Sequence, residues 1–535
     1  MSVDFNIFDA QKFSKFTFLS DKIDTVVKTN EIGTLILDSY ISNLQNETQN
    51  EEEVKDVCVL DSYIAEISDL YGFDVKNHLE NEGYKGKSGS TLKISLPKLN
   101  ADLWENLPSN ILVVGLGEKT LDDCRKAGLE LGRGTVGTQS ACVTFIDSLT
   151  DEQQIAFFDG ILLSCYRQTR IASTNDLKDP VVNIFVLTQN EERASENLQE
   201  SRRIAEATIL ARTLECVPSN VKNPKWLAEN FEELVKQCEN LDGELVFECM
   251  NADELRERGF NAILAVGSAS VTPPCLVTIK WIPKNVRANT PKIVFVGKGI
   301  TYDTGGLSLK PRESMVPMKT DMSGTATVVS AILSIAKAGL NVEVTAVATM
   351  AENAMGASSY RPGDVVKTYA GSTVEILNTD AEGRMVMADG LDYAISDLQA
   401  DIVVDVATLT GAATFGLGRF HAATYSNDDE VWNKMSKASS VIGENVWRMP
   451  LVDDYREVLH SPIADICHVE TEGTVGAGSI TAALFLEHFV KGHKWCHLDI
   501  AGVGRAGKPM GEVSTNQPTG FGAALLYGFV KEYDK

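Results

Sequence analysis

The run VGKGITYDTGGLSLK, residues 296–310, shows most clearly what kind of fold this chain adopts. It starts at the end of an apolar stretch, Ile293–Val296, which predicts a buried strand. It then continues as a glycine-rich segment that also carries lysine and aspartate. Glycine lets a backbone turn tightly and approach a ligand closely. A strand that ends in such a loop is typical of an open α/β sheet, in which function gathers at the carboxyl ends of the strands.

On both sides of this run, short apolar stretches alternate with helical ones, which predicts an α/β protein with mainly parallel strands. The expected strands besides Ile293–Val296 are Ile111–Leu116, Val181–Thr188, Val342–Met350, Ile402–Val406 and Cys496–Ile500. The expected helices are Leu121–Leu131, Ile155–Gln168 and Ala326–Ala338.

The chain of 535 residues is too long for a single core, because domains average about 150 residues. The polar stretch Gln189–Ser201 follows an expected strand and precedes a helix that we expect to begin near Arg202. We therefore predict a smaller N-terminal α/β domain, residues 1–195, and a larger C-terminal α/β domain, residues 196–535. The larger domain should hold a mixed, mainly parallel central sheet.

The composition argues against two classes of partner. The chain has 49 Lys and Arg against 74 Asp and Glu, a formal net charge of −25, which repels nucleic-acid phosphates and anionic membranes. Its apolar runs stay below the roughly 18 residues needed to span a bilayer. Two further features fit a cytoplasmic protein with reduced thiols. The ten cysteines are scattered along the chain, and the first segment, Met1–Phe8, has neither basic nor long apolar character.

A second segment, NTDAEGR at residues 378–384, adds carboxylates to those of the first. If it is extended, Asp380, Glu382 and Arg384 project to one side. Taken singly, either segment could be an ordinary turn with a surface ion pair worth about 0 to 1 kcal/mol. Together with Asp303 and Asp321, however, the two acidic residues would place four negative charges in one cleft, which requires protons or cations.

Two divalent cations would balance four carboxylates, and an oxygen-rich set without histidine or cysteine suits hard or borderline ions. Two such ions can hold a water and a polarised carbonyl together, which is a hydrolytic arrangement. Lys310 and Arg384 would then lie where negative charge develops on a tetrahedral intermediate. Lys298 could serve as a neutral ligand, since an amine held against a metal can lose its proton.

These segments, together with MKTDM at residues 318–322, closely resemble the leucyl aminopeptidase (cytosol aminopeptidase) family of two-metal exopeptidases. The similarity covers roughly residues 200–535 and continues through residues 407–412, 476–483 and 497–502. The chain departs from the family pattern at two places. The run Ser323-Gly324-Thr325 follows Met322, and Gly390 replaces the usual alanine in an expected helix. The second change should cost up to about 1 kcal/mol of helix stability.

The resemblance implies a metal ligand set. Asp303 and Glu382 would bridge two metal ions, Zn²⁺ or Mn²⁺, and Asp380 would complete one site. The other site would be completed by Lys298 and Asp321.

The resemblance also implies roles around the metals. Lys310 would hydrogen-bond the scissile carbonyl oxygen, and Arg384 would hold a bicarbonate ion that acts as general base. The apolar pocket for the first side chain of the substrate would be formed by Met318, Thr408, Gly411 and Ala501.

The sequence therefore predicts a metal-dependent aminopeptidase that removes N-terminal residues, preferably Leu, Met or other apolar residues, from peptides and aminoacyl amides. By resemblance it should be a homohexamer, with an N-terminal domain for assembly or regulation, and with no membrane and no nucleic-acid partner. Two alternatives stay open: a family member with a DNA-binding or regulatory role, and a two-metal hydrolase of another ester class, such as a phosphoesterase.

Overall fold

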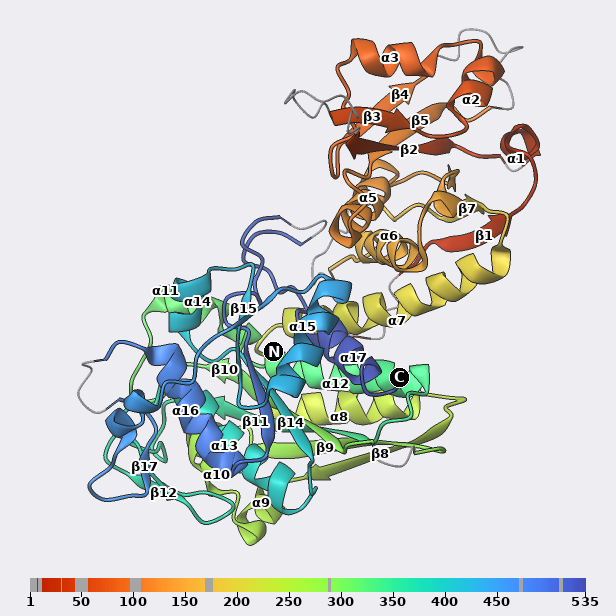
Figure 1. The fold of residues 1–535 in the computed structure, drawn as a ribbon. Coiled ribbons are helices and arrows are strands. Elements are labelled where there is room, and N and C mark those ends of the chain that lie inside the picture. The colour runs from red at the N-terminus through yellow and green to blue at the C-terminus, as the bar shows by residue number, and fades with distance from the viewer. Residues whose placement is uncertain are drawn as a thin grey trace. The chain divides into compact units, whose positions relative to one another are not determined.

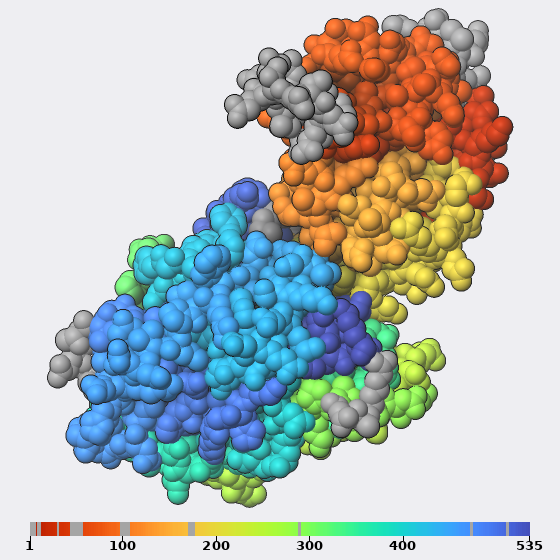
Figure 2. All heavy atoms as spheres, in the orientation of Figure 1, coloured from red at the N-terminus to blue at the C-terminus, as the bar shows by residue number. Residues whose placement is uncertain are grey.

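The chain forms two compact units. The computed structural model describes residues 7, 12–29, 31–43, 56–96, 107–168, 177–286, 290–470, 475–509 and 513–535. Contacts divide the chain after Ala205, so that the larger unit runs from Glu206 to Lys535. Figure 2 colours the atoms of the first unit red to yellow and those of the second unit green to blue. The expected division at residue 195 falls ten residues earlier, inside a helix.

That helix, α7, spans Glu191–Cys216 and corrects the sequence interpretation. The helix begins at Glu191 and not near Arg202, so residues 191–201 are helical. Its first turns pack through polar contacts: Asn197 donates to Gln154, and Ser201 donates to the carbonyl of Ile155. A polar packing face of this kind gives no hydrophobic periodicity, which is the signal that sequence analysis reads.

The N-terminal unit is built on a sheet in the order β1-β7-β6-β2-β5-β4, with β3 paired to β2 (Figure 1). The central pairs are parallel, and β3 and β4 are antiparallel additions. The strands are β1 Lys15–Leu19, β2 Thr34–Asn43, β3 Asp56–Leu60, β4 Thr91–Ser95, β5 Asn110–Gly115, β6 Ser140–Val143 and β7 Asn183–Leu187. The helices are α1 Ile23–Thr29, α2 Ile64–Tyr71, α3 Val75–Asn81, α5 Leu121–Gly134 and α6 Asp151–Ser164.

The larger unit is built on an eight-stranded sheet in the order β16-β15-β18-β14-β10-β11-β9-β8. Its centre, β18-β14-β10-β11, is parallel, and antiparallel pairs join the outer strands β15, β9 and β8. The strands are β8 Gly243–Met250, β9 Cys275–Pro283, β10 Ile293–Asp303, β11 Val344–Asn353, β14 Ile402–Ala407, β15 Ala422–Ser426, β16 Val446–Arg448 and β18 Lys494–Asp499. The predicted fold class, a mixed and mainly parallel central sheet, is confirmed.

The remaining elements surround this sheet (Figure 1). A small sheet joins β12 Val365–Lys367, β13 Thr373–Glu375 and β17 Ile466–Cys467. The helices are α8 Pro224–Lys236, α9 Ala252–Arg258, α10 Asn261–Val266, α11 Arg312–Met315, α12 Ser323–Ala338, α13 Glu382–Ser396, α14 Gly411–Leu417, α15 Asp429–Ile442, α16 Gly478–Val490 and α17 Ala523–Lys531. Among the described helices, none combines the length and apolar character that crossing a bilayer would require. All ten cysteines are free thiols.

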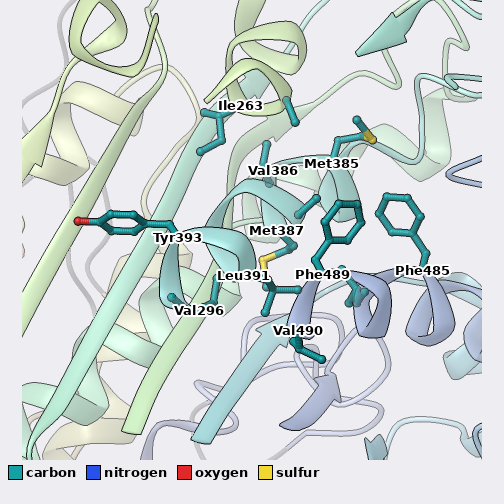
Figure 3. Close-up of a cluster of buried hydrophobic side chains, with 14 of the residues drawn as sticks. Ile263, Val296, Met385, Val386, Met387, Leu391, Tyr393, Phe485, Phe489 and Val490 are labelled. Carbon is teal, nitrogen blue, oxygen red and sulfur yellow. The ribbon is translucent and has the colours of Figure 1, made fainter. Parts of the chain in front are cut away.

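The core around α13 fixes the start of that helix. Met385, Met387 and Leu391 are fully buried and pack among apolar residues of β10, α10 and α16, as Figure 3 shows. Each such side chain contributes about 1.5 to 3 kcal/mol through burial. Because α13 begins at Glu382, the residues of the NTDAEGR segment do not form a strand, and the extended interpretation is wrong.

Helix α12 packs on the opposite face of β10 from α13. Gly390 of α13 approaches Val296, whereas Gly324 of α12 approaches the next strand residue, Gly297, which points the other way. A Cβ atom on Gly297 would lie 2.6 Å from the Gly324 carbonyl oxygen. The two glycines therefore let α12 start directly on the sheet, immediately after Asp321.

Candidate active site and metal centre

The predicted site residues gather at the carboxyl ends of the central parallel strands. Lys298 lies in the middle of β10, directly after its last pair with β14, and Asp303 is the last residue of the strand. Thr408 follows β14, and Ala501 lies just beyond β18. Glu382 opens α13. This edge is where open α/β sheets bind ligands, because the loops that follow parallel strands meet there.

A cavity of about 540 Å³ opens at this edge. Ten of the eleven residues predicted for the site line it: Lys298, Asp303, Lys310, Met318, Asp321, Asp380, Glu382, Thr408, Gly411 and Ala501. Arg384 is not part of the lining.

One ion-pair group joins Lys310 to two carboxylates. Its Nζ lies 2.8 Å from Oδ2 of Asp303 and also pairs with Oδ1 of Asp380. Gly305 has a left-handed backbone (φ 87°), and a Cβ there would lie 2.9 Å from Oδ1 of Asp380. The glycine-rich loop after β10 therefore passes directly over the acidic cluster, as its composition predicts.

A second group joins Lys298 to the other two carboxylates. Its Nζ lies 2.8 Å from Oδ1 of Asp321 and 2.9 Å from Oε1 of Glu382, and it donates to the carbonyl of Thr408 at 3.0 Å. The Thr408 hydroxyl donates to the same Asp321 oxygen at 2.8 Å. The lysine, the aspartate and the glutamate are all almost fully buried.

Burial dominates the electrostatics of both groups. It raises the pKa values of Asp321 and Glu382, and together with the charge of Glu382 it raises the pKa of Asp303 to about 6. Burial opposes the charge of Lys298, but the surrounding carboxylates outweigh it and raise the pKa of this amine. With these carboxylates as their partners both lysines are therefore charged, and they neutralise only part of the acidic cluster. Lys298 would have to lose its proton to become a metal ligand.

The donor set fits divalent cations. One oxygen each of Asp303, Asp380 and Glu382 can be chosen so that the three lie within 4.8 Å of one another. Oδ2 of Asp321 and Oε2 of Glu382 are buried and have no hydrogen-bond partner in the part of the chain that the structure describes. Buried carboxylate oxygens without partners are costly unless a cation or proton meets them.

Comparison with known proteins gives this site its context. A family model described as "Cytosol aminopeptidase family, catalytic domain" matches residues 209–527. The chain is 34% identical over 493 residues to a probable cytosol aminopeptidase of Rickettsia rickettsii, covering 89% of this chain and 96% of the relative. It is 35% identical over 482 residues to one of Phytoplasma australiense, covering 88% and 94%.

The chain belongs to the cytosol aminopeptidase family. It is therefore an aminopeptidase, a hydrolase of peptide bonds, as the motifs indicate. The match to relatives also extends into the N-terminal unit, for which the sequence motifs gave no resemblance. A solved structure with a similar fold is the bottromycin maturation enzyme BotP in complex with Mn, with TM-score 0.78 and 28% identity, covering 94% of this chain and 100% of that one.

Arg384 of this aminopeptidase lies in the first turn of α13 and is not among the residues that line the cavity. Its Nη1 donates to the carbonyl of His468 at 2.6 Å, while its buried Nε has no partner among the described residues. Burial lowers the pKa of Arg384 to about 10, and the charges of Glu382 and Asp499 only partly offset this. A buried guanidinium with an unpaired donor suits a small anion.

Two residues that hold the site in place were not predicted from the sequence. Asn353, the last residue of β11, donates to Oδ1 of Asp303 at 2.8 Å and to the carbonyl of Thr379 at 3.0 Å. Asp499 accepts hydrogen bonds from Thr410 and from the backbone of Ala501. Both lie at strand ends like the predicted residues, and that position is the signal that could have identified them.

Proposed function

We propose that this aminopeptidase uses two divalent ions to remove the N-terminal residue from short peptides and aminoacyl amides. The convergence of four carboxylates, two of which keep buried oxygens without partners among the described residues, is the observation that carries the proposal. Asp303 and Glu382 would bridge the ions. Asp380 would complete one site, and Lys298 with Asp321 would complete the other.

Two ions bound there would supply Lewis acidity for the attacking water and the scissile carbonyl. Both Mn²⁺ and Zn²⁺ are candidates, and the Mn named for BotP supports the first. The rest of the chemistry belongs to the protein. Lys310, partly exposed in the cavity, would donate a hydrogen bond to the carbonyl oxygen as negative charge develops on it.

Arg384 would hold a bicarbonate ion, which would supply the general base, as the family resemblance implies. The unpaired buried Nε supports a bound anion at this position. No histidine is among the residues that line the cavity.

The first side chain of the substrate would lie against Met318, Thr408, Gly411 and Ala501, which line the same cavity. A methionine side chain and small neighbours fit Leu or Met as the first residue. The family resemblance further supports a homohexamer and a cytoplasmic location. Native mass against the 58.2 kDa chain would test the first, and cell fractionation the second.

The central experiment combines metal analysis with turnover of leucine p-nitroanilide. A chelator should abolish turnover, Mn²⁺ or Zn²⁺ should restore it, and the active protein should hold two ions per chain. Asp380→Ala should lose most activity while keeping its fold, whereas Asp454→Ala, which removes an exposed carboxylate elsewhere, should be unaffected. Turnover that persists without metal would contradict the proposal.

The two alternatives are tested with the same preparation. Preferential hydrolysis of p-nitrophenyl phosphate over leucine p-nitroanilide would favour a phosphoesterase. Sub-micromolar, salt-sensitive binding to duplex DNA would favour a regulatory role, which the net charge of −25 opposes.

A further inference from the structure

Two arginines, Arg419 and Arg505, line the cavity that holds the acidic cluster. Arg419 follows α14, and Arg505 lies four residues beyond Ala501. Both are partly buried. Within the described parts of the chain, neither guanidinium has an ion pair or a hydrogen-bond partner, although most arginines of the protein have one. Their role is not explained by the metal ligands or by Lys310.

The positions of these guanidinium groups are unfavourable without an anion. Nη1 of Arg419 is buried with no partner among the described residues. Burial lowers the pKa of Arg505, the positive charge of Arg419 lowers it further, and only Asp321 opposes them. Buried donors without partners and like charges near each other both cost free energy, which a bound anion would recover.

The cavity lining itself does not provide that anion. The carboxylates of Asp303, Asp321, Asp380 and Glu382 pair with the two lysines and form the proposed metal centre, and none of them forms an ion pair with either arginine in the described structure. The remaining acidic residue of the lining, Glu313, is exposed and forms no ion pair with either arginine in the described structure. Among the described residues of the lining, no carboxylate pairs with the arginines, which points to an anion supplied by a ligand.

The place of the arginines indicates a carboxylate of the substrate. They stand in the segments that also supply Gly411 and Ala501, the residues proposed to contact the first side chain. Peptides carry carboxylates on acidic side chains and at their C-terminus, and a guanidinium binds a carboxylate through two parallel hydrogen bonds. A chain of net charge −25 would repel acidic peptides unless it offers local positive charge.

We propose that Arg419 and Arg505 form a carboxylate-binding subsite beside the metal centre, so that the enzyme favours substrates that place a carboxylate there. The inference rests on the proposed function and adds the substrate class. The carboxylate can belong to an acidic first residue or to the C-terminus of a dipeptide, and the chemistry of recognition is the same for both.

Two pairs of substrates separate these sources. Glutamate p-nitroanilide against glutamine p-nitroanilide tests a side-chain carboxylate with no terminal one. Leu-Gly against Leu-Gly amide tests a terminal carboxylate with an uncharged side chain. In the metal-loaded wild-type enzyme, kcat/KM should be higher for the charged member of at least one pair, by about tenfold or more, as expected for a hydrogen-bonded ion pair.

Arg505→Gln and Arg419→Gln should abolish that preference while leaving kcat/KM for leucine p-nitroanilide within about threefold of wild type, since neither arginine forms a hydrogen bond or ion pair with a proposed metal ligand in the described structure. Turnover of the leucine substrate thus also shows that each variant is folded. Arg505→Lys should keep part of the preference. Lys508→Gln, which removes an exposed cation that lies over the Phe420 ring outside the lining, is the matched control and should change nothing.

The outcomes separate the two proposals. If wild type hydrolyses leucine p-nitroanilide but shows no preference in either pair, the carboxylate subsite is wrong and the aminopeptidase proposal stands. A preference that survives both glutamine variants also overturns the subsite, because the recognition must lie elsewhere. If the loaded enzyme hydrolyses no aminoacyl derivative at all, the proposed function fails, and the inference fails with it.

Discussion

Gly390 of α13 tests how closely this helix must pack on the sheet. A Cβ atom at this position would lie 2.7 Å from Cγ2 of Thr349 and 2.7 Å from Cγ1 of Val296. Both neighbours are fully buried β-branched residues on central strands, and the Thr349 hydroxyl is held by the carbonyl of Gly297 at 3.1 Å. Neither can move aside at low cost. We therefore expect Gly390→Ala to destabilise the larger unit.

The magnitude follows from two opposing contributions. Alanine in a helix interior gains up to about 1 kcal/mol over glycine. Overpacking a close-packed core costs about 1 to 3 kcal/mol. The middle of the overpacking range, about 2 kcal/mol, less this gain leaves a net loss of about 1 to 2 kcal/mol. With an unfolding entropy of about 2.1 cal/mol/K per residue over roughly 330 residues, this lowers Tm by about 1.5 °C or more.

Differential scanning calorimetry measures this change, and Gly416→Ala supplies the matched control. Gly416 lies in α14, and a Cβ there meets no atom within 4 Å. The same substitution should therefore be neutral or stabilising at residue 416, by up to about 1 kcal/mol. A rise in Tm for Gly390→Ala would refute the argument. It would also show that the glycine is only the helix-weakening replacement that sequence analysis takes it to be.

Two further predictions concern a partner of the site and the N-terminal unit. Asn353→Ala removes the hydrogen bond to Asp303 and should weaken metal affinity or activity by about 10- to 100-fold, measured by competition with a chromogenic chelator; unchanged affinity would mean that Asp303 needs no such support. Burial, followed by the charge of Asp61, raises the pKa of Asp38 from 3.8 to about 7. Between these values the folded unit keeps a proton that the unfolded chain has lost, so stability should fall as pH rises to about 7. Asp38→Asn should flatten this decline in urea unfolding followed from pH 5 to 8, and an equally steep decline in the variant would exclude Asp38 as its source.

Sequence analysis located the central strands well because parallel strands buried on both faces are continuous apolar runs. Ile402–Val406 and Val342–Met350 are such runs. Strand β14 adds one residue to the first, and β11 begins two residues later and ends three residues later than the second. Strand β10 is the instructive case. Its prediction ended at Val296, yet it continues to Asp303 through glycine, lysine and tyrosine. These residues stay in the sheet because β11 pairs with them nearly to the end of the strand.

The rest depended on contacts that no local pattern records. The first turns of α7 are helical because of polar packing on α6, and Glu382 begins a helix because the apolar residues after it are buried against α16. Arg419 and Arg505 belong to no motif. Only the fold shows that they face one cavity and lack partners among the described residues.

The acidic cluster shows why its composition could be predicted while its geometry could not. Three buried carboxylates and the partly buried Asp380 repel one another, so any fold that collects them must also supply positive charge. This chain supplies Lys298 and Lys310, each between two carboxylates, and thus holds the cluster together from within. The two lysines offset only two of the four charges, Arg419 and Arg505 of the same cavity form no ion pair with the cluster, and buried oxygens stay unpaired in the described structure. The electrostatic deficit that the fold leaves is therefore the physical reason to expect cations there, and it follows from charge and burial without reference to any relative.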